Sequence, residues 1–463
     1  MRKPSKHLNE ETVQTPDEEI IQTADEETAQ TPFDTTKKGI PAMLYFASDY
    51  QEGAHPAIMR RLAETNLSKT SGYGTDEICE SARERIREAC ECPEAEVHFL
   101  AGGTQANAIV ISALLHPWQG VVAADTGHIS IHEAGAIEAG GHKVMTLPHT
   151  LGKISAQQVS DYCKIWENDP NHDHMVSPGM VYLSQPTEYG TLYSLEELQE
   201  MRRVCDRHGL RLYIDGARLA YALAAVQTAE LCSEPKRQPS QPTSASPVSQ
   251  PSQPTSASPV SQPSQPTSAG PVSQPAQPTK ACFASQSPQQ RPQPSALALP
   301  DLARLCDVFY IGGTKCGALL GEAVVIPDPA TLPHFFTIIK QRGALLAKGR
   351  ILGIQFDELF RDGLYLEIGK GAVEKAGRIQ NAFRKAGYET AFESPTNQIF
   401  LNLEDKDMQS LGGRIAFSFW EKSDDTHTIV RLATSWATTE EEVETLEELL
   451  GHMGPVELSR KRT

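Results

Sequence analysis

Two residues that follow apolar segments are suited to Schiff-base chemistry. Lys315 lies in GGTKCGALLG, directly after an apolar run and among small residues. Such surroundings bury the lysine stem and desolvate the amine, which favours the neutral nucleophile that a Schiff base requires. Asp215 ends the apolar run LYID and precedes two small residues. A carboxylate there either caps a helix or keeps a pyridinium nitrogen protonated, and Asp215 alone does not decide between these roles.

A glycine-rich turn, Gly102-Gly103-Thr104, precedes a helix-like segment and offers backbone amides and a hydroxyl to an anion. The turn matches neither the GxGxxG pattern of dinucleotide-binding proteins nor the GxxxxGK[ST] pattern of triphosphate-binding loops. An ordinary strand–helix turn has the same composition. Together with Lys315, Asp215 and Arg218, however, the turn completes the set of groups that a phosphate-bearing cationic heterocycle requires.

The elements around these residues predict an α/β fold. Helix-like segments lie at 77–92, 104–115 and 194–209, and strand-like runs lie at 97–103, 121–125, 180–184, 210–215, 306–313 and 322–328. The strand-like runs are continuously apolar rather than alternating, which indicates a mainly parallel sheet that helices cover on both faces. Ligands of such sheets bind beyond the carboxyl ends of the strands. The candidate residues follow the strands and are therefore expected at one edge of the sheet.

Composition excludes several classes of function. The chain has 463 residues, a formal net charge of −17 and a pI near 5.3, so nucleic acid and anionic membranes repel it. No run of 18 apolar residues is present, and the first residues lack the apolar core of a secretory signal. The nine cysteines are scattered without a CxxC pair, which predicts reduced thiols in the cytoplasm. We predict no metal site.

Two segments are predicted to lie outside the packed core. Residues 1–40 include Glu10–Asp34, with nine acids and no base, and are interpreted as a disordered acidic tail. The sequence QPSQPTSASPVS at 238–249 returns at 250–261, which gives a 12-residue repeat with no apolar set that could stack as a solenoid. Residues 232–297 are therefore interpreted as a disordered, extended insertion. A partner-binding tail and a phosphorylated or SH3-binding repeat are the alternatives.

Several motifs in order resemble the threonine aldolase and β-eliminating lyase family of fold-type I pyridoxal 5′-phosphate enzymes. The resemblance covers about 44–231 and 301–445. Its motifs are LYIDGARLAYAL (212–223), AGGTQAN (101–107), GGTKCGALLGEAVV (312–325), FASDYQEGAHPAIMRRL (46–62), SGYGTDEICESARERI (71–86) and IVRLATSWATTEEEVE (429–444). The resemblance implies a large cofactor domain at 41–335, interrupted by 232–297, and a smaller C-terminal α/β domain at 336–463.

The resemblance assigns the cofactor contacts residue by residue. Lys315 matches the lysine that holds the cofactor covalently, and Asp215 matches the acid on the ring nitrogen. His128 matches the histidine that stacks on the ring, although His132 lies four residues further on and is an alternative. The phosphate turn of the family matches Gly103 and Thr104, with Gln105 beside them.

The substrate contacts follow in the same way. Arg218 and Arg431 match the arginines at the substrate carboxylate, and Ser48 matches a serine there. Arg218 is also expected to contact the cofactor. Tyr73 matches an active-site tyrosine that the resemblance supplies across a subunit interface, so we expect a homodimer or homotetramer. Where the aldolases carry a histidine in ENTHN, this chain reads SQPTEYG, with Glu188 near that position.

The expected reaction is cleavage of a threonine-like β-hydroxy-α-amino acid to glycine and an aldehyde. Either Glu188 or His128 would then act as the base that accepts the hydroxyl proton. The departures at Glu188 and at Thr314, where the family has serine before the lysine, concern the side-chain chemistry rather than the cofactor. β-Elimination or transamination on the same cofactor is the alternative, and a binding scaffold without catalysis is a third.

Overall fold

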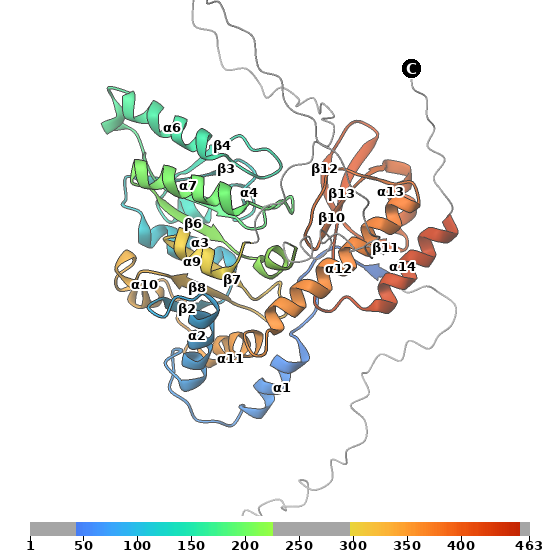
Figure 1. Cartoon of the computed structure of the whole chain (residues 1–463), viewed down its shortest axis with the longest axis horizontal. Coiled ribbons are helices and arrows are strands. Elements are labelled where there is room, and N and C mark those ends of the chain that lie inside the picture. Colours follow the sequence, from blue (N-terminus) through green and yellow to red (C-terminus); the bar gives the residue numbers. More distant parts are fainter. Residues whose placement is uncertain (1–42, 226–296, 454–463) are drawn as a thin grey trace, which may run out of the picture. The chain divides into compact units, whose positions relative to one another are not determined.

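The computed structural model describes residues 43–225 and 297–453 (Figure 1). The predicted acidic tail, 1–40, and nearly all of the predicted insertion, 232–297, lie outside the described residues. The described part resumes at Leu297, whose side chain is buried in the main core.

A seven-stranded sheet forms the centre of the large lobe, in the order β2-β8-β7-β6-β5-β3-β4. Its strands are β2 (Glu96–Leu100), β3 (Gln119–Ala124), β4 (Val144–Leu147), β5 (Ser177–Ser184), β6 (Arg211–Asp215), β7 (Val308–Gly312) and β8 (Glu322–Ile326). The strands are parallel except for β8, which pairs antiparallel with both β2 and β7. The prediction of a mainly parallel sheet is confirmed.

Both faces of this sheet are buried, as the continuous apolar runs predicted. Along β3, Val121 and Ala123 pack into one hydrophobic core, while Val122 and Ala124 pack into the other. Helices cover the two faces (Figure 1). In chain order the helices of the large lobe are α1 (Pro56–Glu64), α2 (Glu77–Ala89), α3 (Gly103–Leu114), α4 (His128–Ile131), α5 (Ala136–Ala139), α6 (Ala156–Asn168), α7 (Leu195–His208), α9 (Leu299–Leu305), α10 (Phe335–Gln341) and α11 (Arg350–Leu359), and α1 packs on α11.

Local sequence signals fix where these helices begin and end. The α7 helix starts at a capping box, in which the Ser194 hydroxyl accepts a hydrogen bond from the Glu197 amide and the Glu197 side chain accepts one from the Ser194 amide. Gly209 ends the helix with φ of 65°, a conformation in which glycine avoids a Cβ clash. The predicted helix at 194–209 is therefore confirmed, caps included.

The small lobe has its own sheet and core. Its strands β9 (Glu389–Thr390), β10 (Gln398–Glu404), β12 (Ser418–Lys422) and β13 (His427–Ala433) form an antiparallel sheet in the order β12-β13-β10-β9. This sheet packs with α12 (Leu364–Lys385), α13 (Asp405–Gly412) and α14 (Glu440–Met453). The predicted boundary at 335/336 between the two domains stays a prediction.

The N-terminal part of the described chain is tied to the small lobe. Strand β1 (Leu44–Tyr45) pairs in parallel with β11 (Ile415–Ala416), and Phe46 accepts a hydrogen bond from the Ala433 amide. Residues 47–50 follow directly and enter the region between the lobes, so their position depends on C-terminal strands more than 360 residues away in sequence.

The direction of the strands brings the candidate residues together. Because β2, β3, β5, β6 and β7 are parallel, their carboxyl ends meet at one edge of the sheet. Since β8 runs the opposite way, its first residue, Glu322, lies at this same edge.

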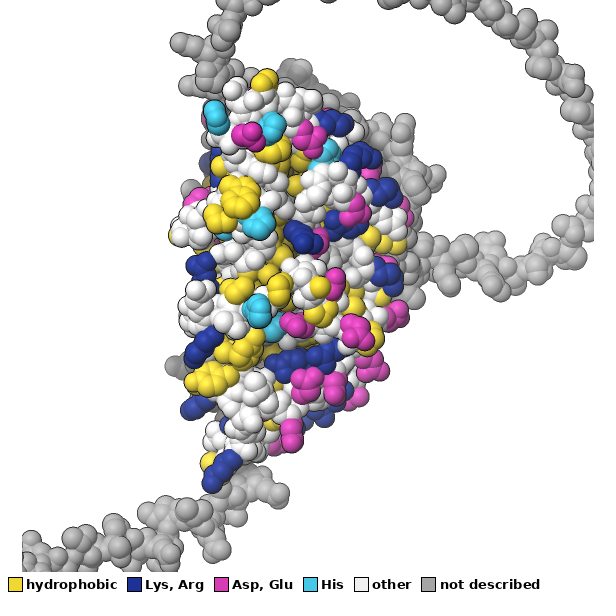
Figure 2. All heavy atoms as spheres, turned by 90° about the vertical axis from the view of Figure 1, so that its left-hand side faces the viewer, with side chains coloured by type: hydrophobic (Ala, Val, Ile, Leu, Met, Phe, Trp, Pro, Cys, Tyr) yellow, Lys and Arg dark blue, Asp and Glu magenta, His cyan; other side chains and the backbone are white. Residues whose placement is uncertain are grey.

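The helices of the described part of the chain show no sign of a membrane-spanning segment. In the residues 43–225 and 297–453, no helix combines the length and the apolar character needed to cross a membrane. On the face drawn in Figure 2, Lys and Arg side chains are interspersed with Asp and Glu side chains.

Candidate active site

A cavity of about 340 Å³ lies at the carboxyl edge of the large sheet. It brings together most of the predicted cofactor and catalytic residues, which are separated by up to 212 positions in the chain. The predicted residues that line it are Gly103, Thr104, His128, Glu188, Asp215, Arg218 and Lys315. They come from the carboxyl ends of five strands, β2, β3, β5, β6 and β7, or from the segments that follow them, as the parallel sheet requires.

The glycine turn leaves the N-terminus of α3 open. Gly102 has extended backbone and gives α3 no side-chain cap, so the first amides of the helix remain available to an anion. A Cβ at Gly103 would lie 3.0 Å from the Tyr310 hydroxyl, so this position has little room for a side chain. The Gln105 side chain accepts a hydrogen bond from the Ala101 amide and is not among the residues that line the cavity.

Asp215 is buried beneath the cavity and accepts hydrogen bonds from several donors. Tyr310 and Tyr182 donate through their hydroxyls, the latter over 2.6 Å, and Asn107 donates its side-chain amide over 3.1 Å. The Ala217 amide donates over 3.0 Å. Burial opposes ionisation, but the charge of His128 and these hydrogen bonds lower the pKa of Asp215 below its ordinary value. A carboxylate so held can keep a ring nitrogen protonated.

Lys315 presents its amine to the same cavity. Burial and the positive charge of Arg218 lower the pKa of Lys315, which increases the fraction of neutral amine. Its ammonium nitrogen lies 5.9 Å from the centre of the Tyr50 ring, which also lines the cavity. The backbone carbonyl of Lys315 accepts a hydrogen bond from Tyr221, which holds the loop after β7.

His128 begins α4 and is oriented by a buried acid. Its Nδ1 lies 2.7 Å from Oε1 of Glu133, which is 5% exposed. Burial lowers the pKa of His128, but the hydrogen bond to Glu133 and the charge of Asp215 outweigh burial and raise it. Glu188 accepts hydrogen bonds from the His128 amide over 2.9 Å and from the Ser184 hydroxyl over 2.8 Å. Burial raises the pKa of Glu188.

Arg218 has one edge of its guanidinium already occupied. Its Nε and Nη2 donate to the two carboxylate oxygens of Asp49 over 2.6 and 2.9 Å. Asn397 from the small lobe donates to the same carboxylate over 2.9 Å. Burial acts against the charge of Asp49, but Arg218 holds the pKa of Asp49 at about 2. Arg218 therefore faces the cavity as half of a buried ion pair.

A second cavity of about 600 Å³ adjoins the first and extends to the small lobe. His128, Glu188, Arg218 and Lys315 line both cavities, and Arg431 of β13 lines the second. The Arg431 guanidinium makes only long hydrogen bonds of 3.4 Å, to the Gln398 side chain and the Ala47 carbonyl. Its Nε is buried and has no partner in the described part of the chain.

Two further predicted residues, Ser48 and Tyr73, line neither of these cavities. The Ser48 hydroxyl is buried and has no hydrogen-bond partner among the described residues. Tyr73 is 44% exposed and lines neither cavity, and its ring lies 4.4 Å from the Lys340 ammonium group. Within one chain, therefore, the structure does not bring Tyr73 to the other predicted residues. His132, the alternative to His128, lines the second cavity.

Residues 46–406 match the family model described as beta-eliminating lyase. The chain belongs to the beta-eliminating lyase family. A solved structure of Leishmania major threonine aldolase is 36% identical, has a TM-score of 0.70 and covers 88% of this chain and 99% of its own. A low-specificity L-threonine aldolase of Pseudomonas aeruginosa is 24% identical over 80% of this chain and 87% of its own length.

More distant structures share the fold. An aspartate aminotransferase of Thermus thermophilus is 12% identical with a TM-score of 0.55, over 89% of this chain and 91% of its own. The likeness at this identity concerns the fold alone, which is fold-type I as predicted. The chain is thus a pyridoxal 5′-phosphate-dependent lyase of that fold.

The residues of the cavity fit this cofactor chemically. The open α3 N-terminus suits a phosphate, the ionised Asp215 suits a protonated ring nitrogen, and the Lys315 amine suits an aldehyde carbon. Arg431, which lines the second cavity, has a buried Nε without a partner in the described part, and a bound carboxylate could satisfy it. The Ser48 hydroxyl is equally without a partner there, but Ser48 lines neither cavity.

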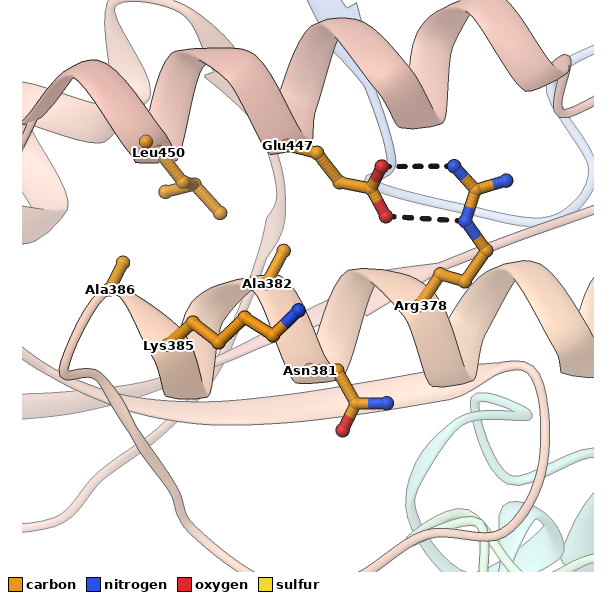
Figure 3. Close-up of a pocket in the computed structure, with 8 residues that line it drawn as sticks. Arg378, Asn381, Ala382, Lys385, Ala386, Glu447 and Leu450 are labelled. Carbon is orange, nitrogen blue, oxygen red and sulfur yellow. Dashed lines mark hydrogen bonds and ion pairs between the residues drawn. The ribbon is translucent and has the colours of Figure 1, made fainter.

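A third cavity, of about 440 Å³, lies between α12 and α14, away from these residues (Figure 3). Arg378 donates from Nε and Nη2 to the Glu447 carboxylate across this groove, over 3.2 and 2.9 Å. The pair joins the two helices of the small lobe and therefore explains the charged lining of the groove. In the described part of the chain, no group of three or more His, Cys, Asp or Glu side chains is arranged to hold a metal ion.

Sequence reasoning missed several residues of the site. Asp49 lies inside the motif FASDYQEGAHPAIMRRL and Asn107 inside AGGTQAN, so their places in these motifs could have pointed to them. Tyr182 and Tyr310 lie inside apolar strands and look like ordinary core residues in the sequence. Glu322 is the first residue of a strand, and only the antiparallel direction of β8 places it at the cavity.

Proposed function

We propose that this enzyme cleaves a threonine-like β-hydroxy-α-amino acid into glycine and an aldehyde. The relatives named threonine aldolase support this substrate class, and the Leishmania major enzyme matches over nearly its entire length. The observation that carries the proposal is that one cavity joins a lysine with a lowered pKa to a buried carboxylate that stays ionised, Lys315 and Asp215.

The proposed roles follow from the electrostatics of these residues. The cofactor, when bound, supplies an electron sink that accepts the electrons of the broken carbon–carbon bond. Asp215 keeps the proton on the ring nitrogen, because its tyrosine and amide donors stabilise the carboxylate. Lys315 would hold the cofactor through its amine, and the lowered pKa of that amine would let it act as a neutral nucleophile toward the cofactor's aldehyde carbon.

The substrate carboxylate is assigned to the small-lobe side of the cavity. Arg431 has an unpartnered Nε and only long hydrogen bonds, so its guanidinium can take up a carboxylate without first losing a strong ion pair. Arg218 is fixed by Asp49 and adds positive charge from the opposite side. The Ser48 hydroxyl, which is buried and lines neither cavity, would donate a further hydrogen bond only if it turned toward the substrate.

We assign the base to Glu188. Glu133 engages Nδ1 of His128 over 2.7 Å and raises the pKa of His128 in spite of its burial, so His128 keeps its proton to higher pH than a free imidazole. Burial raises the pKa of Glu188, which makes its carboxylate a stronger base. The proton of the β-hydroxyl passes to Glu188, the carbon–carbon bond breaks, the aldehyde leaves and a proton returned to the α-carbon completes glycine.

Product analysis tests the proposed reaction. Purified enzyme with pyridoxal 5′-phosphate is incubated with L-threonine, L-allo-threonine and 3-phenylserine, and glycine, aldehyde, ammonia and keto acid are each measured. We expect glycine and aldehyde in equal amounts. Ammonia with a keto acid would instead identify β-elimination, and a keto acid that depends on an added amino acceptor would identify transamination.

We further propose that the enzyme is a homodimer or homotetramer in a reducing, cytoplasmic compartment. The exposed Tyr73, which lies outside the cavity of its own chain, supports an oligomer whose partner completes the site. All cysteines of the described part are free thiols, which supports a reducing compartment. Light scattering of the purified protein and fractionation of cells that express it test these two points.

A further inference from the structure

A buried acid, Glu322, lines the cofactor cavity without any role in the proposed reaction. It is 3% exposed and is the first residue of β8. The Lys, Arg and His side chains that line this cavity in the described part are His128, Arg218 and Lys315, and Asp49 already pairs with Arg218. An additional acid in a cavity that must accept a phosphate requires an explanation.

The sheet places Glu322 next to the predicted phosphate turn. Strand β8 lies between β2 and β7, and Glu322 is the partner of Leu100 on one side and of Gly312 on the other. The turn Ala101–Thr104 follows Leu100 directly, and Lys315 follows Gly312 by three residues. Glu322 therefore stands between the phosphate turn and the Lys315 loop, two strands away from β6 and its Asp215.

Two hydrogen bonds from the Lys315 loop hold the Glu322 carboxyl in place. The Thr314 hydroxyl donates to Oε1 over 3.0 Å, and the Gly313 amide donates to Oε2 over 3.2 Å. The Gly321 amide in turn donates to the Thr314 hydroxyl over 3.0 Å, which fixes the direction of that hydroxyl. The carboxyl is thus part of the built wall of the cavity.

The surroundings of Glu322 favour its neutral form. Burial, together with the negative charge of Asp215, raises the pKa of Glu322 to about 8, although Lys315 and the two hydrogen bonds oppose this. Other ionisable groups that interact with Glu322 are neutral phenols and a thiol at pH 7, because burial raises the pKa of each: Tyr213, Tyr310, Cys316 and Tyr365. Below pH 8, the acid that shares this cavity with the phosphate turn, and that pairs with the residue directly before it, is therefore a carboxylic acid that can donate a hydrogen bond.

We propose that Glu322 binds the cofactor as a protonated acid and donates its proton in a hydrogen bond to the phosphate group. An O–H donor to a charged oxygen is a strong hydrogen bond, and it adds to the open amides of α3 and the Thr104 hydroxyl. Ionised Glu322 would instead repel the phosphate. The inference rests on the cofactor and is independent of which reaction the enzyme catalyses.

Proton linkage gives the sign and size of the effect. A bound phosphate favours the protonated acid, so the bound form keeps its proton to higher pH than the free form. Affinity for the phosphate is then constant well below pH 8 and falls as pH rises through about 8. Between pH 6.5 and pH 9, free Glu322 goes from almost fully protonated to about one-tenth protonated, which predicts a loss of about tenfold in affinity.

Binding of pyridoxine 5′-phosphate and of pyridoxine to the cofactor-free enzyme tests this inference by calorimetry. Neither probe has an aldehyde, so Lys315 cannot react with them, and the ratio of their dissociation constants isolates the phosphate. In the wild-type enzyme we expect the preference for the phosphorylated probe to fall about tenfold from pH 6.5 to pH 9. In Glu322→Gln, whose amide donates at every pH, the preference should stay constant within about twofold.

A matched control uses the other glutamate of the cavity. Glu188→Gln, in the loop after β5 and three strands away from β8, should keep the full pH dependence of the phosphate preference. The proposal is overturned if wild-type enzyme shows no fall in that preference, or if Glu322→Gln shows the same fall. The wild-type titration decides the first point even where the variant does not fold, and loss of lyase activity has no bearing on either.

Discussion

At the scale of single residues, Asp215 has the most defined task, because four donors stabilise its negative charge. Asp215→Asn keeps the shape of the side chain but removes the charge opposite the ring nitrogen. We expect the variant to bind the cofactor and to lose most of its kcat, since a neutral pyridine is a poor electron sink. Steady-state kinetics and the absorption spectrum of the cofactor measure both effects. Unchanged kcat would show that Asp215 is only a structural acid at the start of the following turn.

Lys315→Ala should abolish the covalent attachment of the cofactor and its visible absorption band. Turnover should be lost as well, because Lys315 is the only lysine among the described residues that line the two cavities. Circular dichroism should show an intact fold, since the Lys315 side chain contributes little to the core. Lys164→Ala, at an exposed lysine of α6 that pairs with Asp161, is the control for loss of a lysine elsewhere. A Lys315→Ala enzyme that kept its band and its activity would remove Lys315 from the site.

Arg431 should matter for substrate and not for cofactor. Loss of one partner of a desolvated charge pair typically costs about 2–5 kcal/mol, so Arg431→Ala should lower kcat/KM at least about tenfold with an unchanged cofactor spectrum. Arg431→Lys should recover only part of this, because lysine cannot form the two-pronged contact. Arg378→Ala, which breaks the salt bridge of Figure 3, is the matched control for losing an arginine of the small lobe. Near-normal kcat/KM with lowered thermal stability would make Arg431 a structural residue.

The sequence predicts the residues that carry the chemistry better than it predicts the contacts that fix their side chains. Lys315 and Asp215 could be recognised because each follows an apolar strand within a recognisable motif. The pairing of Arg218 with Asp49 joins positions 169 residues apart, and no local pattern reveals such a contact. The prediction that Arg218 contacts the substrate carboxylate is untested, and the structure shows that one edge of its guanidinium belongs to Asp49.

At the scale of elements, the N-terminus of α3 depends on the absence of a side chain at Gly103. Gly103→Ala would place its Cβ 3.0 Å from the Tyr310 hydroxyl, which also donates to Asp215. We expect weaker cofactor binding, because either the helix start or the tyrosine must shift, and Tyr310→Phe should restore part of the affinity. The control is Gly377→Ala in α12, where an added Cβ would meet no neighbouring atom within 4 Å. This variant should leave cofactor affinity unchanged and raise the free energy of unfolding by about 0.5–1 kcal/mol.

Helices and strands, like single residues, can be predicted where a local sequence pattern marks them and not where a distant contact decides. Continuous apolar runs and capping residues predicted β2, β3, β5, β6, β7, β8, α2, α3 and α7 close to their observed bounds. The reversed direction of β8 could not be predicted, because a buried antiparallel strand has the same apolar pattern as a parallel one. Strands β9 and β12 of the small lobe are not predicted either, since β9 has only two residues and β12 is partly exposed, and neither has a continuous apolar run.

At the scale of the whole molecule, the position of Tyr73 leads to a test of shared active sites. If Tyr73 completes the site of a partner, then Tyr73→Ala and Lys315→Ala subunits are both inactive alone, yet a mixed dimer contains one complete site. Refolding equal amounts together should then restore about one quarter of wild-type activity, because half of the dimers are mixed and each has one working site. Mixing that restores nothing would show that Tyr73 does not act across the interface.

The chain between β6 and β7 offers a second test at this scale. These strands are parallel neighbours, and residues 226–296 fall within the connection between them. Deleting 232–296 with a short glycine linker, and keeping the buried Leu297, should leave kcat/KM within a few-fold, since loop closure depends only weakly on length. Loss of soluble, folded protein would show that the repeat is needed for folding.

The same connection divides the active site into two covalently separable sets. Asp215 and Arg218 precede it, while Lys315 and Arg431 follow it, and the adjacent strands β6 and β7 bring the two sets into one cavity. A cut within 232–296 would therefore yield two fragments, neither of which contains a complete site. Catalysis would then report directly on the reassociation of the two fragments, which makes this fold a candidate for a split-enzyme sensor of molecular proximity.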